Sequence, residues 1–175
     1  MSEGLPFSRP YNLNRLGQAG DTVDVAISDQ ERTQLAQFVG VPRVDAFSAK
    51  IELKKLGSNR FQLNFSLTAD ICQSCVVTLV DVPAHIERHF VRELHFNPAL
   101  HRGEQPAAEN IPLEDDVLKE IGSLHYDLAA ALIEELVLGV DPYPRAPGAA
   151  FEPPGSGEEP PENPFAVLKG LKSGL

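Results

Sequence analysis

Apolar and polar residues alternate along two stretches in the first half of the chain, with the period of a β-strand. In residues 61–71 the odd positions are apolar or small: Phe61, Leu63, Phe65, Leu67, Ala69 and Ile71. Side chains of a strand point alternately to its two faces, so this pattern predicts a strand with one buried face. Residues 44–56 repeat the pattern, with these side chains predicted to face inward: Phe47, Ala49, Ile51 and Leu53. Gly57-Ser58-Asn59 between the two stretches predicts a hairpin.

Four more segments read as extended. Residues 6–16 predict an edge strand because Pro10 cannot donate to a ladder, and residues 22–27 alternate as a second strand. Residues 76–80 and 83–96 predict two further strands, with Pro83 marking an edge or a break. Strands that follow one another through short loops favour antiparallel pairing.

Two helices are predicted from their caps and their apolar stripes. Ser28 and Glu31 have the spacing of a capping box and predict a helix over residues 29–39. Asp127 is the expected cap of a second helix over residues 127–138, whose stripe contains Leu128, Leu132 and Leu136. Together the elements predict an α+β fold: an antiparallel, curved sheet of about six strands, for which a barrel-like form is one outcome, with two packed helices.

The domain organisation follows from a change in composition. Residues 1–144 are expected to form a single α+β domain, within which residues 97–110 read as a mobile loop and residues 111–121 as a short strand or turn. Residues 145–162 are rich in proline and glutamate and predict a flexible linker. Residues 163–175 predict a short helical element, since apolar residues return at helical spacing: Phe165, Leu168 and Leu171. These three residues are predicted to dock, either on a partner or back on the domain.

Charge and composition narrow the classes of function. The chain has 175 residues and a formal net charge of −10, which argues against a nucleic-acid coating protein and against DNA as a partner. Residues 1–105 carry 11 Lys+Arg and 12 Asp+Glu, whereas residues 106–175 carry 4 and 13, so the first part could still present a local basic face. No apolar run is long enough to cross a bilayer, and the N-terminal residues lack the pattern of a signal peptide. We therefore expect a cytoplasmic protein without a membrane partner.

Both cysteines, Cys72 and Cys75, fall where one predicted strand gives way to the next. With His85 and His89 they form the spacing C-x2-C-x9-H-x3-H, whose residue types suit zinc. The two histidines, however, lie on a predicted strand about 13 Å apart, at ~3.3 Å per residue, too far to bind one ion without a bend. Two half-buried structural thiols are the preferred interpretation, with no metal and no cofactor, and a small zinc or thiol protein is the alternative.

We find no spacing typical of a catalytic site. Histidines 85 and 89 share a strand face with Glu87, but no nucleophile with an orienting acid accompanies them, and there is no glycine-rich phosphate loop. The chain is therefore expected not to be an enzyme.

Basic residues bracket the predicted hairpin: Arg43, Lys50, Lys54, Lys55 and Arg60. Such a set is often ordinary surface charge, but it is also the candidate RNA-binding surface of this chain, with Arg88 and Arg92 as expected neighbours. Phe47 and Phe61 are expected in the core, so a platform for stacking of single-stranded bases is not predicted.

Three motifs in the same order resemble the YceD family, also called large ribosomal RNA subunit accumulation proteins. They are residues 70–79 around the cysteines, residues 126–138 with the proline turn that follows, and residues 163–169. The resemblance implies a role in accumulation of large-subunit ribosomal RNA in bacteria and plastids, with ribosomal RNA or large-subunit ribosomal proteins as partners. Many relatives have a second cysteine cluster after the long helix, which would suggest a zinc site, but residues 141–148 of this chain contain no cysteine. The functional expectation is therefore a non-enzymatic factor in ribosome assembly.

Overall fold

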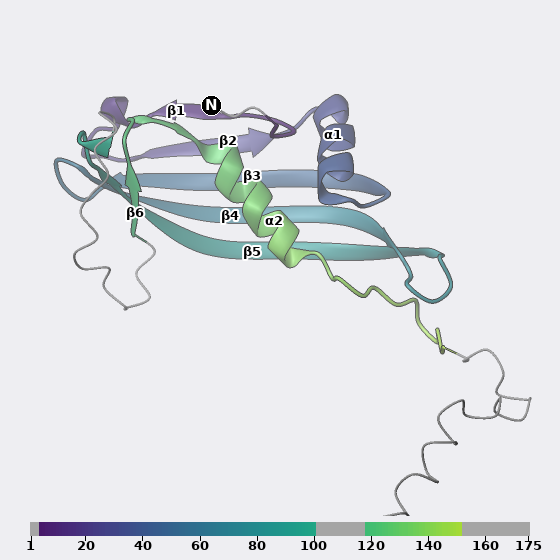
Figure 1. Cartoon of the computed structure of the whole chain (residues 1–175). Helices are drawn as coiled ribbons and strands as arrows, with labels where there is room; N and C mark the ends of the chain where they lie inside the picture. The colour runs from purple at the N-terminus through teal and green to yellow at the C-terminus, as the bar shows by residue number, and fades with distance from the viewer. Residues whose placement is uncertain (1–3, 101–117, 152–175) are drawn as a thin grey trace, which may run out of the picture.

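A computed structural model of the chain describes residues 4–100 and 118–151. Its main element is a sheet of five strands in the order β2-β3-β4-β5-β6. Their bounds are Asp21–Ala26, Arg43–Lys55, Arg60–Ser74, Asp81–Phe96 and Leu118–Ile121. Two short strands, β1 (Pro10–Asn12) and β7 (His125–Asp127), form a separate antiparallel pair. One helix, α2 (Leu128–Gly139), crosses one face of the sheet (Figure 1).

The α+β class is confirmed, and the details of the sheet correct four expectations. The sheet has five strands instead of about six, and its outermost strands in the described part of the chain, β2 and β6, do not pair, so no barrel closes. Strand β6 runs parallel to β5, which is possible because about twenty residues connect the two strands, enough for a crossover. Residues 76–80 form a turn and not a strand, because β4 continues to Ser74 and pairs at once with β5.

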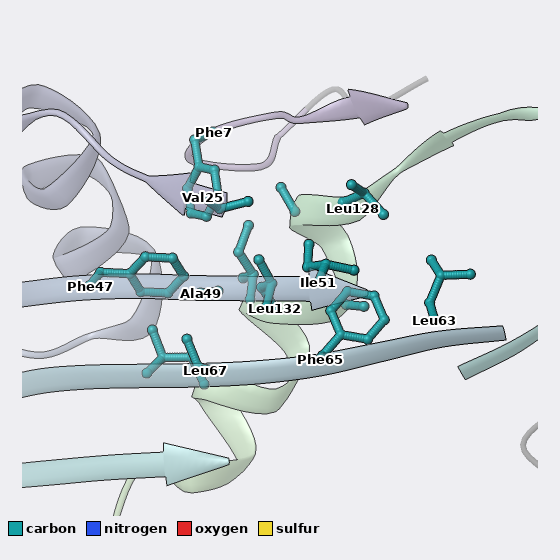
Figure 2. Close-up of a cluster of buried hydrophobic side chains, with 14 of the residues drawn as sticks. Phe7, Val25, Phe47, Ala49, Ile51, Leu63, Phe65, Leu67, Leu128 and Leu132 are labelled. Atoms are coloured by element: carbon teal, nitrogen blue, oxygen red, sulfur yellow. The ribbon is translucent and has the colours of Figure 1, made fainter. Parts of the chain in front are cut away.

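The alternating pattern places one apolar face of β3 and β4 in the core. Ile51 and Leu53 on β3 lie opposite Phe65 and Leu63 on β4, and all four side chains are almost fully buried. Phe7, Phe47, Leu128 and Leu132 join this cluster (Figure 2). The predicted inward residues are thus confirmed, and the opposite side of the sheet, called here the outer face, carries the even-numbered residues of both strands. Lys50 lies on this outer face and is exposed.

Helix α1 (Asp29–Val39) forms where its sequence signals predict it. Ser28 caps the helix, and its side chain and that of Glu31 complete the capping box. The helix ends at Gly40, whose φ of 79° lies in the left-handed region that glycine adopts without a steric penalty. The side chains of Leu35 and Ala36 are buried and pack the helix against the core beside β3.

Helix α2 is also confirmed, with Asp127 as its cap. Its apolar stripe lies on the core face of the sheet, and at its end a Cβ on Gly139 would lie 2.9 Å from Ile86 of β5. The helix therefore approaches the sheet closely because its last residue has no side chain. No helix in the described ranges has the length and apolar character needed to span a membrane.

The predicted N-terminal edge strand is shorter than expected. Only Pro10–Asn12 forms a strand, and a 3-10 turn, η1 (Leu13–Arg15), follows it. Arg9 joins three elements there: its guanidinium bonds Glu31 of α1 and the carbonyl of Ala26, and its backbone N–H bonds Asp127. These bonds hold the carboxylate of Glu31 ionised, and Arg9 together with the Ser28 N–H lowers the pKa of Glu31 to about 2.

Several predicted segments lie outside the described residues. They are most of the loop at 97–110, most of the linker at 145–162, and the helical element at 163–175 with Phe165, Leu168 and Leu171. The described start of the linker contains Ala146, which makes a hydrogen bond to the domain.

Candidate functional site

The two cysteines lie at one end of the sheet, as the sequence predicts. Cys72 is near the end of β4, opposite Arg43 of β3 and Pro83 of β5. Cys75 begins the connection from β4 to β5, defined here as the cysteine turn, Cys75–Val80. Both thiols are free and fully buried.

The sulfur of Cys75 is surrounded by backbone donors. The N–H groups of Ala146 and Thr78 point to Sγ with N···S distances of 3.3 and 3.4 Å. These hydrogen bonds, first that from Ala146 and then those from Thr78, lower the pKa of the Cys75 thiol to about 6 because they stabilise the thiolate. Cys75 is therefore an acceptor that fastens two distant parts of the chain.

Two further bonds attach the segment after α2 to the cysteine turn. The Val76 N–H donates to the carbonyl of Pro144 at 2.9 Å, and the buried Gln73 side chain donates to the carbonyl of Asp141 at 2.7 Å. Figure 1 shows this segment leaving α2 toward the loop that joins β4 and β5. Periodicity did not reveal this contact, since it joins residues about 70 positions apart. The only sequence signal for it is the resemblance, which relates residues 141–148 to the cysteine pair.

Cys72 has the opposite environment. Burial raises the pKa of its thiol, and a hydrogen bond to Asp81 raises it further. Arg43 lies beside it and bonds Asp45 and Asp81 at 2.9 and 2.8 Å. The pair therefore consists of a protonated Cys72 near an ion-pair cluster and a Cys75 with thiolate character.

The two histidines of the zinc-like spacing are exposed on the outer face of β5 and have other partners. Nδ1 of His85 lies 2.6 Å from the carboxylate of Asp70, and His89 contacts Ser66 and Glu87. Within residues 4–100 and 118–151, no three His, Cys, Asp or Glu side chains are grouped so that they could hold a metal ion.

The basic residues around the hairpin do not form one cluster. Arg43 starts β3, and Lys55 ends it about 40 Å away at ~3.3 Å per residue. Lys50 and Lys54 share the outer face, while Lys55 pairs with the buried Phe61 and so has the opposite parity. Arg60 also lies on the outer face, where it forms an ion pair with Glu93 at 2.9 Å. The hairpin thus places Lys50, Lys54 and Arg60 on one face, with Lys50 about 13 Å from Lys54 along β3 at ~3.3 Å per residue and Glu52 between them. The fold places Arg43 at the cysteines.

The two arginines expected as neighbours of the hairpin belong to the other face of the sheet. Arg92 lies beside α2 and bonds Glu135 at 3.1 Å and Glu134 at 3.4 Å. Arg88 reaches toward the carbonyl of Leu138 at the end of the same helix. Both therefore contribute to the packing of α2 on β5.

Residues 63–172 match the protein family described as large ribosomal RNA subunit accumulation protein YceD. The match covers more than half of the chain, and the chain therefore belongs to this family. It includes both cysteines and the segment after α2, whereas all five basic residues proposed for RNA contact precede it. No curated protein and no solved structure matches the chain.

Proposed function

We propose that this chain is a non-enzymatic factor in the accumulation of large-subunit ribosomal RNA, acting by binding to RNA or protein of the assembling subunit. The family match carries this proposal, because the family is described by its role in large ribosomal RNA subunit accumulation. The open outer face of the sheet supports a binding role. It spans β3 to β5 and is polar and accessible along its length, with the exposed side chains Lys50, Lys54, His85 and His89.

The outer face near the hairpin is the proposed RNA contact. Lys54 and Arg60 are neighbours there, and Lys50 lies further along β3 on the same face. Lys55 ends the same strand next to the turn, so its charge also belongs to the proposed contact although its side chain leaves the opposite face. At about 0.15 M salt, charges more than roughly 8 Å apart are largely screened, so distant acidic residues do not prevent local phosphate contacts. Glu52 and Glu93 lie on the same face, 3.9 Å from Lys50 and 2.9 Å from Arg60, and reduce its positive charge. We expect weak binding that depends on RNA shape or on a companion protein.

Charge reversal at the hairpin tests the mode of binding. The double variant Lys54→Glu, Lys55→Glu is compared with wild type for co-sedimentation with large-subunit precursors at two salt concentrations, with and without ribonuclease. Reduced co-sedimentation and a weaker salt dependence are expected, because phosphate contacts release counterions. Unchanged co-sedimentation and salt response would exclude the hairpin and leave recruitment by a ribosomal protein.

A second candidate function rests on the donors around Cys75. A buried sulfur with two N–H donors and a lowered pKa is suited to a thiol or metal role, with Cys72 beside it in the sequence. Metal analysis of protein purified without chelator separates the two candidates. One equivalent of zinc that is lost in Cys72→Ser would favour a zinc protein, and protein without zinc would favour the binding factor.

A further inference from the structure

A groove lies beside the cysteine turn and is lined mainly by apolar residues. Its volume is about 320 Å³, at the lower limit of the range in which ligand pockets fall. Three parts of the chain meet in it: the end of α1, the end of β4 and the segment after α2. The apolar lining consists of Val41, Pro42, Val76, Val140, Pro142 and Pro144.

The cysteine turn next to this groove exposes apolar side chains that folding alone does not require. Val76, Leu79 and Val80 are 46%, 78% and 51% exposed. Leu79 has a φ of 61°, and it is the only non-glycine residue with positive φ in the described part of the chain. A bulky residue is held in this region at an energetic cost, and such strain concentrates at ligand clamps and other functional positions. Val76 belongs both to the turn and to the lining of the groove, so the two form one apolar surface.

The chain itself contains a segment suited to this surface. The described residues end at Phe151, five residues beyond Ala146, whose N–H is bonded to Cys75 within the turn. Residues 152–164 are rich in proline, glycine and glutamate, and they are followed by apolar residues at helical spacing: Phe165, Leu168 and Leu171. The segment also carries Lys169 and Lys172 and no acidic residue, whereas the groove is bordered by the exposed carboxylate of Asp141.

We propose that residues 163–175 of the same chain dock in the groove beside the cysteine turn, through Phe165 and Leu168. Thirteen connecting residues have a root-mean-square span of about 20 Å if flexible, which is long enough to return to the groove from Phe151. A tether of this length gives an effective concentration in the millimolar range, so even a contact with a millimolar Kd is substantially occupied. The family match, residues 63–172, contains the cysteine turn beside the groove and most of the docking segment, residues 163–175.

A tryptophan probe tests the proposal in the full chain. The chain has no tryptophan, so Phe165→Trp introduces a single fluorophore in the docking segment. Its emission is compared with that of the peptide 163–175 carrying the same substitution, free in solution. The docked tryptophan is expected to emit to the blue of the peptide and to be less accessible to acrylamide.

Two second-site variants locate the docking surface. Val76→Asp, which places a charge in the groove, is expected to shift the emission back to that of the free peptide. Leu56→Asp at the distant hairpin is the control, because Leu56, like Val76, is a half-exposed apolar residue. This variant is expected to leave the blue shift unchanged. Far-ultraviolet circular dichroism and thermal unfolding establish that both variants are folded. If Val76→Asp does not fold, Pro142→Ser is used as the groove variant.

Three outcomes would overturn the proposal. Emission equal to that of the free peptide in the full chain would show that the segment is not docked on the domain. A blue shift that disappears on dilution would assign the groove to the segment of a second copy. A blue shift that survives the groove variant would place the segment elsewhere on the domain. None of these outcomes depends on RNA binding, so the proposed function is tested separately.

Discussion

Two turns connect neighbouring strands of the same sheet at its opposite ends, and they differ in chemistry. The hairpin between β3 and β4 is Gly57-Ser58-Asn59, with ordinary backbone angles and two hydrogen bonds to the carbonyl of Arg60. The cysteine turn between β4 and β5 has an exposed leucine with positive φ and is fastened to a segment about 70 residues away. Glycine and small polar residues are sufficient to reverse the chain, so folding alone explains the composition of the hairpin turn.

The cysteine turn contains features that a simple reversal does not need. An apolar, strained loop that requires other parts of the chain to hold it is expected where a molecule binds something. The difference supports the proposed docking of residues 163–175 at the cysteine turn and leaves charge contacts as the proposed role of the hairpin. The variants below change one of the two ends, and all but the two cysteine variants are compared with a variant at the other end.

Removing the thiolate of Cys75 should change how stability depends on pH. The folded-state pKa of Cys75 is about 6 and the ordinary value is 9, so between these values the unfolded state binds more protons. The free energy of unfolding of the wild type should therefore rise from pH 6 to pH 9, and this part of the rise should be lost in Cys75→Ser. Urea unfolding at several pH values measures it.

Cys72→Ser provides the control for that experiment. The pKa of Cys72 is raised above 9, so its contribution is present below pH 9 and is lost only at higher pH. The slope between pH 6 and pH 9 should remain in this variant. An identical loss of slope in both variants would contradict the assignment of the thiolate to Cys75.

Gln73→Ala should destabilise the protein by about 0.5–1.5 kcal/mol, because the buried Gln73 side chain no longer donates to the carbonyl of Asp141. Amide exchange at Val76 and Ala146 should become faster as the segment after α2 loosens. Gln62→Ala, on the same strand near the hairpin and on the outer face, should change stability by less than about 0.5 kcal/mol. Equal losses from the two variants would remove the distinction between the ends.

The same substitution at two exposed leucines should have opposite signs. Leu79→Gly should stabilise by about 0.5–1 kcal/mol, since the left-handed conformation costs a non-glycine residue ~1–2 kcal/mol and glycine offsets part of the gain through its entropy. Leu56→Gly, next to the hairpin and without positive φ, should destabilise by about 0.5–1 kcal/mol. Chemical denaturation of the two variants measures both, and a loss at Leu79 would show that its backbone is not strained.

Charge reversal should affect stability least. Lys54→Glu with Lys55→Glu should change the free energy of unfolding by less than about 0.5 kcal/mol, because both side chains lie at the solvated end of β3. Arg43→Glu should cost more than the hairpin variant, because it removes ion pairs to Asp45 and Asp81 beside Cys72. Thermal unfolding distinguishes the two variants, and a larger loss at the hairpin would contradict the comparison.

The local elements of this fold could be predicted from sequence because their signals are local. The Ser28 capping box, the Asp127 cap and the alternation from Phe61 to Ile71 each depend on residues within one element, and all three are confirmed. The glycine-containing hairpin is confirmed for the same reason. Local propensity therefore explains most of β2 to β5 and both helices.

The candidate site could not be predicted in the same way because its contacts are distant in sequence. Residues 76–80 look like a strand by composition, and only the pairing of Ser74 with Asp81 shows that the chain reverses there. The parallel pairing of β6 and the N–H of Ala146 on Cys75 likewise depend on tertiary arrangement. The sequence places Arg43 near the other basic residues of the hairpin. In the fold, however, Arg43 lies at the cysteine end, because it begins the long strand β3 and the hairpin follows the end of that strand.

The central claim, a role in large-subunit ribosomal RNA accumulation, is tested most directly by the ratio of large- to small-subunit ribosomal RNA in cells of the source organism. The ratio is measured after deletion of the gene that encodes the chain. It is measured again after complementation with the wild type, with the groove variant Val76→Asp, or with the hairpin variant Lys54→Glu, Lys55→Glu. We predict that deletion lowers the ratio and that wild type restores it. A ratio that is unchanged by deletion would contradict the account.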